Sequence, residues 1–140
     1  THIIPLAIDA SRQGKRFKIF GNKYDTNDGT CVRDYVHVMD LADAHIKALQ
    51  HASNNLVSEV INLGSGAPAS NKELLDTVQK YTGKMNIDVY GNRPGDPAYL
   101  VADITRAKEI LDWEPKQSTI DNVVATAVQW YNKTHKKEIQ

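Results

Sequence analysis

Apolar residues recur along this chain with two different spacings, one typical of helices and one typical of strands. The helical spacing predicts helices over 4–13, 40–52, 70–81, 104–111 and 120–131. Short runs of strand-forming residues predict strands over 17–20, 32–38, 60–63 and 87–90. Because helices and strands intermix throughout the chain, the pattern predicts a fold of the α/β or α+β class.

Two of the predicted helices begin at residues that are good helix caps. Ser70 and Glu73 stand three positions apart, as in a capping box, and Asp40 and Asp43 form a similar pair. We therefore expect Ser70 and Asp40 to cap the helices that they precede. The polar stretch 133–140 follows the last helix, and we expect it to fray.

The composition is that of a globular domain without a strong charge. The 140 residues are 41% hydrophobic, and 17 Lys and Arg balance 17 Asp and Glu. This balance argues against nucleic acid or an anionic membrane surface as a partner, and no apolar run approaches the ~18 residues of a membrane span. The single cysteine, Cys31, excludes an internal disulfide and is typical of a reducing compartment such as the cytoplasm.

Residues 64–69 match the G-x-G-x-x-A form of a dinucleotide-binding motif, and Asp88 follows at roughly the distance of a ribose-binding acid. In such a motif the helix opens within the glycine loop, so that its first amides meet the pyrophosphate. Here Pro68 interrupts the motif, and the cap at Ser70 places the helix start after it. We interpret the stretch as a tight strand-to-helix turn, and a cofactor site is the less favoured alternative.

Two other groups of residues could carry chemistry. His37, Asp40, Asp43 and His45 lie close enough along the chain to suggest a metal site. A helix cap at Asp40 and a packed histidine at His45 explain them more simply, so we predict no metal. Cys31 could act as a nucleophile with a histidine, but no local pattern places a base beside it.

Two arginines differ from ordinary surface charges because they stand on stiff segments. Arg33 follows a glycine turn, and Arg93 lies within 92–97, which contains two prolines and a glycine. An arginine on a rigid loop can present its planar guanidinium to phosphate oxygens at a small ordering cost, so the two could clamp a diphosphate. Pairing of these arginines with Asp34 or Asp96 explains them equally well from composition.

Longer stretches of the chain carry a family resemblance. Residues 19–45, which include Asp-Gly-Thr-Cys-Val-Arg-Asp-Tyr-Val-His-Val at 28–38, strongly resemble the UDP-glucose 4-epimerase family. The Arg-Pro-Gly-Asp sequence at 93–96 is similar to a loop shared by many extended short-chain dehydrogenase/reductase enzymes that act on nucleotide sugars. The resemblance covers nearly the whole chain, and its other segments are 1–5, 62–66 and 107–115.

The resemblance implies an enzyme of galactose metabolism that interconverts UDP-glucose and UDP-galactose. In this family tightly held NAD takes hydride from C4 of the sugar and returns it to the other face, while a Tyr-x-x-x-Lys pair handles the hydroxyl proton. Neither that pair nor the family's Gly-x-x-Gly-x-x-Gly motif occurs here. We therefore expect 1–140 to be the C-terminal, UDP-sugar-binding domain, α/β with an α+β-like character and without the Rossmann domain. It would contain no catalytic residue and bind no NAD of its own.

The resemblance also assigns contacts to the phosphate and sugar parts of the substrate. It implies that Arg33 and Arg93 bind the diphosphate and that Asp96 accepts hydrogen bonds from the ribose hydroxyls. Tyr99 matches a position that lines the hexose pocket, where its bulk would leave little room for an N-acetyl group.

The uridine contacts implied by the resemblance lie earlier in the chain. Ile3 matches a loop residue that meets the uridine side through its backbone. Lys18, Ile19 and Phe20 match a segment whose backbone pairs with uracil, with Phe20 beside the base.

Finally, the resemblance implies that residues 33–52 return to pack on the NAD-binding domain. In that case this chain presents apolar surface, and one candidate is the face formed by Leu41, Ala44, Ala48 and Leu49. We expect self-association through this region. Two alternatives to the epimerase remain: another nucleotide-sugar epimerase or dehydratase of the same superfamily, and a nucleotide-sugar-binding module without catalysis.

Overall fold

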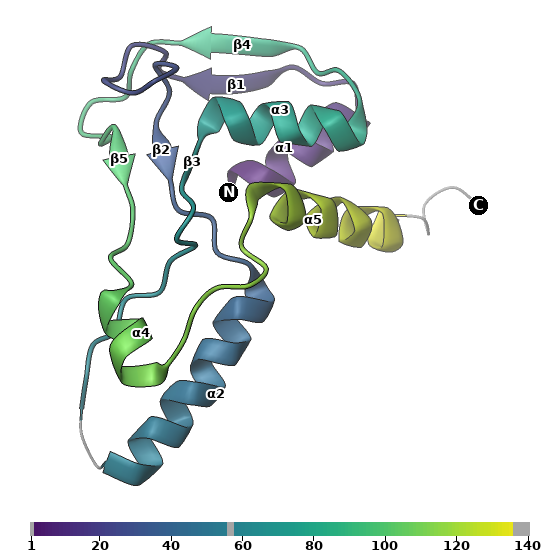
Figure 1. The fold of residues 1–140 in the computed structure, drawn as a ribbon. Helices are drawn as coiled ribbons and strands as arrows, with labels where there is room; N and C mark the ends of the chain where they lie inside the picture. Colours follow the sequence, from purple (N-terminus) through teal and green to yellow (C-terminus); the bar gives the residue numbers. More distant parts are fainter. Residues whose placement is uncertain (1, 56–57, 136–140) are drawn as a thin grey trace.

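A computed structural model of the chain describes residues 2–55 and 58–135 (Figure 1). Along these residues the helices are α1 (Ile3–Arg12), α2 (Val38–Asn55), α3 (Asn71–Thr82), α4 (Thr105–Leu111) and α5 (Ile120–His135). The strands are β1 (Phe17–Phe20), β2 (Val32–Arg33), β3 (Ala69–Ser70), β4 (Ile87–Tyr90) and β5 (Tyr99–Leu100). The mixed class of fold that the sequence predicts is confirmed.

One end of the molecule, which we call the head, consists of α1, β1, α3, β4 and α5. β1 and β4 pair in parallel, with Phe17 opposite Ile87 and Phe20 opposite Tyr90. The three helices pack against one another beneath this two-stranded sheet (Figure 1). They share a core whose buried residues are Ala7, Ile8, Ala10, Phe17, Ile19, Leu74, Leu75, Val78, Val124 and Val128. Side-chain alternation along β1 places Phe17 in this core and leaves Lys18 exposed.

A second sheet lies beside the head. β2 is its central strand, antiparallel to β3 and parallel to β5. Of the predicted strand over 32–38, only Val32–Arg33 is a strand, and the strand predicted over 60–63 is wrong, because 58–65 form none. β5 is a strand that the pattern missed. A strand needs a partner for its backbone groups, and the side-chain pattern of one segment does not reveal which partner the fold supplies.

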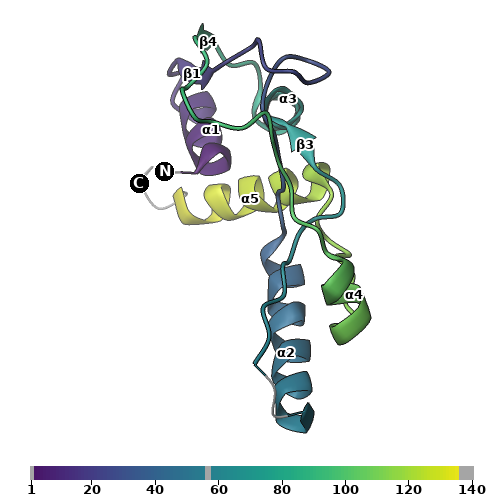
Figure 2. The ribbon, with the colours of Figure 1, turned by 90° about the vertical axis from the view of Figure 1, so that its left-hand side faces the viewer.

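The other end of the molecule, which we call the arm, consists of α2 and α4 together with Trp113. Figure 2 shows α2 standing away from the head, with α4 at its side. The buried residues of the arm's small core are Ala44, Ala107, Leu111 and Trp113. The indole N–H of Trp113 also donates to the backbone oxygen of Asp40 at 3.1 Å, which ties the indole to the first turn of α2.

The start of α2 differs from the prediction. The helix begins at Val38, and Nδ1 of His37 accepts a hydrogen bond from the backbone N–H of Met39 at 3.1 Å. His37 therefore caps the helix, and its other ring nitrogen, Nε2, lies 3.0 Å from the hydroxyl of Thr126. The histidine, which the sequence presents as a candidate metal ligand, is used to join α2 to α5.

Asp40 does not cap its own helix, so that prediction is wrong. It lies in the first turn of α2, is buried, and accepts hydrogen bonds from the backbone N–H groups of Lys116 (3.0 Å) and Gln117 (2.9 Å). The hydroxyl of Ser118 donates to the same carboxylate at 2.5 Å. Burial raises the pKa of Asp40, but the hydrogen bonds outweigh it and the net pKa is lowered. The local spacing predicted that this carboxylate caps the helix, but it binds a loop that is distant in sequence.

The start of α3 is as predicted. The hydroxyl of Ser70 accepts the backbone N–H of Glu73 at 3.0 Å, and the carboxylate of Glu73 accepts the backbone N–H of Ser70 at 2.7 Å. This reciprocal pair is a complete capping box. Both partners are local, which is why spacing alone was sufficient to predict it.

The last helix extends further than predicted. α5 continues to His135, three residues into the segment that we expected to fray, and 136–140 lie outside the described residues. The ring of His135 stacks on that of Tyr131, with centroids 3.9 Å apart, and its Nδ1 lies 3.0 Å from the backbone oxygen of Tyr131. These contacts extend the helix by a turn of polar residues.

The exposed apolar face of α2 is also not the predicted one. Ala44 is buried against α4, and Ala48 packs on the same core, so these two residues face inward. Leu49 is 73% exposed, as expected. The exposed residues at spacings of three and four, which we call the α2 stripe, are Met39, Ala42, Ile46 and Leu49. Apolar residues occupy two sides of this helix, and only the position of α4 decides which side is covered.

Candidate functional site

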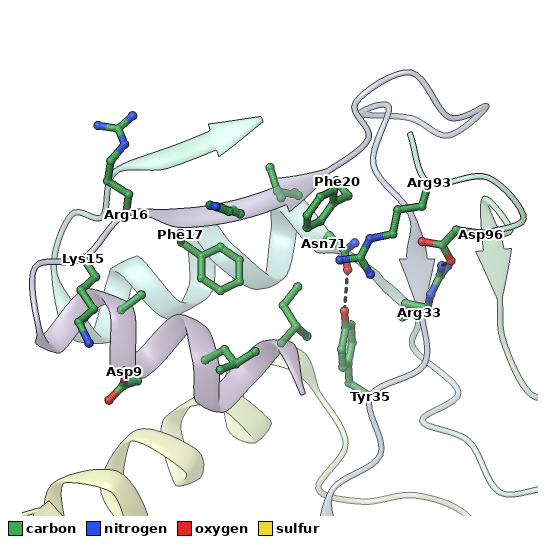
Figure 3. A pocket seen from close by; sticks show the side chains of 15 residues that line it. Asp9, Lys15, Arg16, Phe17, Phe20, Arg33, Tyr35, Asn71, Arg93 and Asp96 are labelled. Carbon is green, nitrogen blue, oxygen red and sulfur yellow. Dashed lines mark hydrogen bonds and ion pairs between the residues drawn. The ribbon is translucent and has the colours of Figure 1, made fainter. Parts of the chain in front are cut away.

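A pocket of about 640 Å³ opens in the head and reaches toward β2 (Figure 3). Its lining residues are Ile3, Leu6, Asp9, Ala10, Lys15, Arg16, Phe17, Lys18, Ile19, Phe20, Arg33, Tyr35, Asn71, Arg93 and Asp96. Five of these side chains are Lys or Arg and two are Asp, although the whole chain has a formal net charge of zero. The local excess of positive charge favours an anionic ligand in this pocket.

Arg33 is held in the pocket by three acceptors. Its Nη2 donates to Oδ1 of Asp96 at 2.5 Å, and its Nη1 donates to the backbone oxygens of Val32 (2.8 Å) and Pro97 (2.9 Å). The ion pair that composition suggested is therefore present. A guanidinium has five N–H donors, so these bonds fix its orientation and still leave donors for an anion.

Arg93 is ordered by an aromatic ring. Its Cζ lies 3.9 Å from the centroid of the Phe20 ring, and its backbone N–H donates to the phenol oxygen of Tyr24 at 3.1 Å. In the part of the chain that the structure describes, no carboxylate pairs with Arg93. The Nζ atom of Lys18 lies in a similar way over the ring of Tyr90, 5.5 Å from the ring centroid. Such cation–π contacts orient a cation without neutralising its charge, so both cations can still attract an anion.

Tyr35 and Asn71 form a polar pair in the lining of the pocket. The hydroxyl of Tyr35 donates to Oδ1 of Asn71 at 2.9 Å, and Figure 3 shows this bond below Phe20. Burial raises the pKa of Tyr35, and the positive charge of Arg33 offsets this rise only in part. The net pKa is about 12. The phenol therefore keeps its proton at neutral pH and remains a donor to Asn71.

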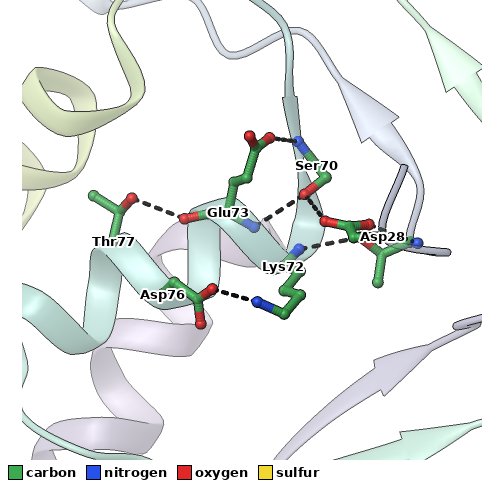
Figure 4. A network of polar contacts seen from close by, with 7 residues as sticks. Asp28, Ser70, Lys72, Glu73, Asp76 and Thr77 are labelled. Carbon is green, nitrogen blue, oxygen red and sulfur yellow. Dashed lines mark hydrogen bonds and ion pairs between the residues drawn. The ribbon is translucent and has the colours of Figure 1, made fainter. Parts of the chain in front are cut away.

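The loop before β2 is anchored to the start of α3, and this anchor positions the site (Figure 4). The carboxylate of Asp28 accepts hydrogen bonds from the hydroxyl of Ser70 (2.5 Å) and from the hydroxyl (2.7 Å) and backbone N–H (2.9 Å) of Thr30. Burial raises the pKa of Asp28, but these hydrogen bonds lower it by more. The net pKa is therefore below its ordinary value, and the charged carboxylate is favoured. The network holds Arg33 at a set position relative to Asn71.

Seven of the eight substrate-contact residues implied by the resemblance line this one pocket: Ile3, Lys18, Ile19, Phe20, Arg33, Arg93 and Asp96. Tyr99 does not line it. This residue lies on β5 opposite Val32 of β2, and its side chain is 55% exposed. The structure thus gathers residues from distant segments at one place, and their individual roles stay predictions.

The sequence pointed to neither Tyr35 nor Asn71 as site residues. Tyr35 follows Arg33 by two positions, a spacing that puts both side chains on one side of an extended chain, and this signal could have identified it. Nothing in the sequence marks Asn71. It reaches the pocket because β3, which precedes it, pairs with β2.

The glycine motif at 64–66 is a crowded turn and not a cradle for a dinucleotide. The carboxylate of Asp34 accepts the backbone N–H of Ser65 at 2.6 Å and lies against Gly64, where a Cβ atom would clash with it. The same carboxylate accepts the backbone N–H of Ala102 at 3.1 Å. The glycine is explained by this close approach of Asp34, as the interpretation of a tight turn requires.

The other two parts of a dinucleotide site also do not form. α3 begins at Asn71, beyond the motif, so its first amides do not meet the glycines. Asp88 pairs with Arg16 across the end of β1. The residues at this motif therefore do not fit NAD.

The candidate metal ligands do not converge either. His37 caps α2, Asp40 binds the loop before α5, and Nδ1 of His45 lies 2.7 Å from the backbone oxygen of Leu41. Across residues 2–55 and 58–135, no group of three or more His, Cys, Asp and Glu could hold a metal ion. Cys31 is buried, and its Sγ lies 3.8 Å from the carboxylate of Asp96.

No helix in the described ranges is long and apolar enough to cross a membrane.

Comparison with known proteins identifies the family. The family model described as GDP-mannose 4,6 dehydratase matches residues 1–126. The chain therefore belongs to this family, whose name is that of an enzyme acting on a nucleotide sugar. Within it, the chain is similar to UDP-glucose 4-epimerases, which confirms the resemblance seen in the sequence.

Three of these relatives illustrate the similarity. The UDP-glucose 4-epimerase of Lactobacillus helveticus is 47% identical over 98% of this chain and 42% of its own length. A crystal structure of a UDP-glucose 4-epimerase superposes with a TM-score of 0.90 at 37% identity, covering 100% of this chain and 43% of that one. The epimerase of Stenotrophomonas maltophila, solved with bound NAD and formylated UDP-arabinopyranose, gives a TM-score of 0.91 at 29% identity over 98% of this chain and 41% of its own.

The chain thus spans about two fifths of the length of the relatives that it matches. It corresponds to the C-terminal part of the epimerase structures.

Proposed function

We propose that this chain is the UDP-sugar-binding portion of a UDP-glucose 4-epimerase, an enzyme of galactose metabolism that works in the cytoplasm. The observation that carries the proposal is the meeting of Arg33 and Arg93 in one pocket with Phe20. Two arginines supply the fixed donors that a diphosphate needs, and the strand edge beside Phe20 offers backbone groups to a base. A relative that binds NAD and a UDP-pentose supports the same ligand class.

The residues that this chain contains are suited to binding the substrate and not to the chemical step. Arg33 and Arg93 bind the diphosphate, Asp96 accepts from the ribose hydroxyls, and the chain contributes binding and orientation. Hydride transfer is supplied by NAD, bound with the Tyr-x-x-x-Lys pair in the remaining portion of the enzyme. By itself this chain is therefore inactive and binds no NAD.

The hexose would extend from the arginines toward β5. Tyr99 lies on β5, which pairs with β2, the strand that carries Arg33, so a hexose on the phosphate farther from the ribose would lie toward Tyr99. The exposed side chain of Tyr99 would then complete a hexose site together with residues of the remaining portion.

The α2 stripe is the surface on which we place the NAD-binding portion. It lies on the segment 33–52, and its residues are uncovered although all of them are apolar. The relatives are more than twice as long as this chain, which supplies an occupant of sufficient size. When that portion is absent, the stripe promotes self-association of the chain.

A second candidate is another nucleotide-sugar epimerase or dehydratase, and the GDP-mannose 4,6 dehydratase description of the matching family model favours it. Calorimetric titration of the chain with UDP, UDP-galactose, GDP-mannose and dTDP-glucose separates the two. We expect the two uridine ligands to bind at least about tenfold more tightly, because the segment Lys18–Phe20 would pair with uracil. A preference for GDP-mannose would support the second candidate, and binding of none of them would contradict both.

A further inference from the structure

Asn71 lines the pocket beside the residues to which substrate contacts are assigned. Its Oδ1 accepts the hydroxyl of Tyr35 at 2.9 Å. Among the residues that the structure describes, none accepts a hydrogen bond from its side-chain amide. A side-chain amide carries two N–H donors, so a half-buried group in a ligand pocket is left with its donors unused.

The side chain supplies these donors, and the helix end does not. Asn71 is the first residue of α3, and its backbone N–H already donates to the oxygen of Cys31 at 2.9 Å. The backbone N–H of Glu73 is taken by the hydroxyl of Ser70 in the capping box. The side-chain amide of Asn71 is therefore the free donor at this point of the lining.

We propose that the side-chain amide of Asn71 binds the phosphate next to the nucleoside of a bound nucleotide, and that Tyr35 is the residue that positions it. This inference rests on the proposed UDP site. In Figure 3 Asn71 lies below Phe20, where the base is placed, and Arg93, whose Cζ is 3.9 Å from the centroid of the Phe20 ring, is the arginine beside the base. The phosphate next to the nucleoside is the one closest to the base, and it is therefore the acceptor expected at this end of the pocket.

Tyr35 gives the amide a single orientation. Since the phenol remains protonated, it donates to Oδ1 and selects the rotamer in which Nδ2 points away from Tyr35. A neutral donor adds directionality to a site whose charge is already supplied by Arg33 and Arg93. Asn71 therefore distinguishes nucleotides from nucleosides by geometry.

The test compares UDP, UMP and uridine by titration calorimetry on the 140-residue chain and its variants. For Asn71→Ser we expect UMP and UDP to bind about threefold to tenfold more weakly, as for one lost hydrogen bond, with uridine unchanged. For Asn71→Asp we expect at least about a tenfold loss for UMP and UDP only, because a carboxylate replaces the donor and repels phosphate.

Tyr35→Phe should cause the same pattern more weakly, and Tyr35→Phe combined with Asn71→Ser should cost no more than Asn71→Ser alone. Asn54→Asp, an exposed position in the last turn of α2, is the matched control for the added charge. Unchanged melting temperatures without ligand separate positioning from a structural role.

Two results would overturn the inference without affecting the proposed function. The first is an equal loss for uridine and UMP, which would place the contact on the nucleoside. The second is unchanged affinity of all three ligands in both Asn71 variants. If the unsubstituted chain binds no UDP, the proposed function fails and this contact fails with it.

Discussion

The head and the arm bury their apolar residues to different extents. In the head, three helices and β1 bury a continuous core among themselves. In the arm, four residues form the buried core, while Ile46 and Leu49 on the outer side of α2 are 58% and 73% exposed. The head also contains the pocket. The head therefore has the larger core, although Trp130 on α5 is 66% exposed, whereas most of the apolar stripe on α2 in the arm is left uncovered.

The largest expected effect tests whether the two regions unfold separately. Trp113 is fully buried in the arm, and Trp113→Ala should cost about 3–5 kcal/mol locally. Because the rest of the arm's core is small, hydrogen exchange of α2 should become fast, while UDP affinity stays within about threefold.

Leu74→Ala is the matched change in the head, where Leu74 is equally buried. It should cost about 2–5 kcal/mol and abolish UDP binding, because the pocket is built on this core. If Trp113→Ala removes UDP binding as completely as Leu74→Ala does, the head and the arm are one cooperative unit.

Arg33→Ala tests whether the ligand binds in the pocket and not at the arm. Loss of hydrogen bonds to a charged group should weaken UDP binding by about 1.5–3 kcal/mol in calorimetry. Arg106→Ala is the control, because Arg106 lies on the arm and pairs with Glu59 at 2.7 Å. Equal losses from both variants would mean that general charge, and not the pocket, attracts the ligand.

Asp40→Asn tests the joint between the regions. The carboxylate accepts from three donors of the loop before α5, and an amide leaves at least one of them unpaired, at a cost of about 1–3 kcal/mol at pH 7.

The pH dependence of this cost has a definite sign. The pKa of Asp40 is lowered in the folded chain, so its stabilisation is complete above the pKa of an unfolded aspartate, about 4. It is lost as the pH falls through the lower, folded-state pKa. Urea unfolding should therefore show a gap between the native chain and Asp40→Asn that is constant above about pH 5 and shrinks in more acidic solution. A gap that widens in acid would refute this role of Asp40.

The smallest effect on stability is expected in the α2 stripe. Ile46→Lys removes nothing from the arm's core, so unfolding should change by less than about 0.5 kcal/mol. Sedimentation should show less self-association than the native chain, whereas the control Asn54→Lys, at the exposed end of α2, should not differ from it. A native chain that stays monomeric at high concentration would remove the stripe as an association surface.

Local signals predicted local structure well. The capping box at Ser70 and Glu73 needed only residues three positions apart, and β1 and β4 needed only short runs of strand formers. Predictions failed where a distant partner decided the outcome. Asp40 binds the loop at 116–118, and the predicted strand over 60–63 finds no ladder partner.

In the candidate site, too, local signals predicted little of what distant contacts decide. All eight substrate contacts were assigned by family resemblance, and only Arg33 and Arg93 were also singled out by the stiff segments on which they stand. Seven of the eight line the pocket, although no physical pattern links Lys18 to Arg93 along the chain. Tyr35 had a weak signal in its spacing from Arg33. Asn71 had none, because a single asparagine at a helix start is ordinary until β2 and β3 pair and turn it toward the pocket.

The sequence by itself determined the mixed fold class, most of the helices and the family, because these depend on residue order and on local backbone preferences. Only the tertiary structure decided which face of α2 is covered, which residue caps it and where Arg33, Arg93 and Asn71 meet. Those outcomes depend on contacts between segments far apart in the chain, and such contacts form only when the chain has folded.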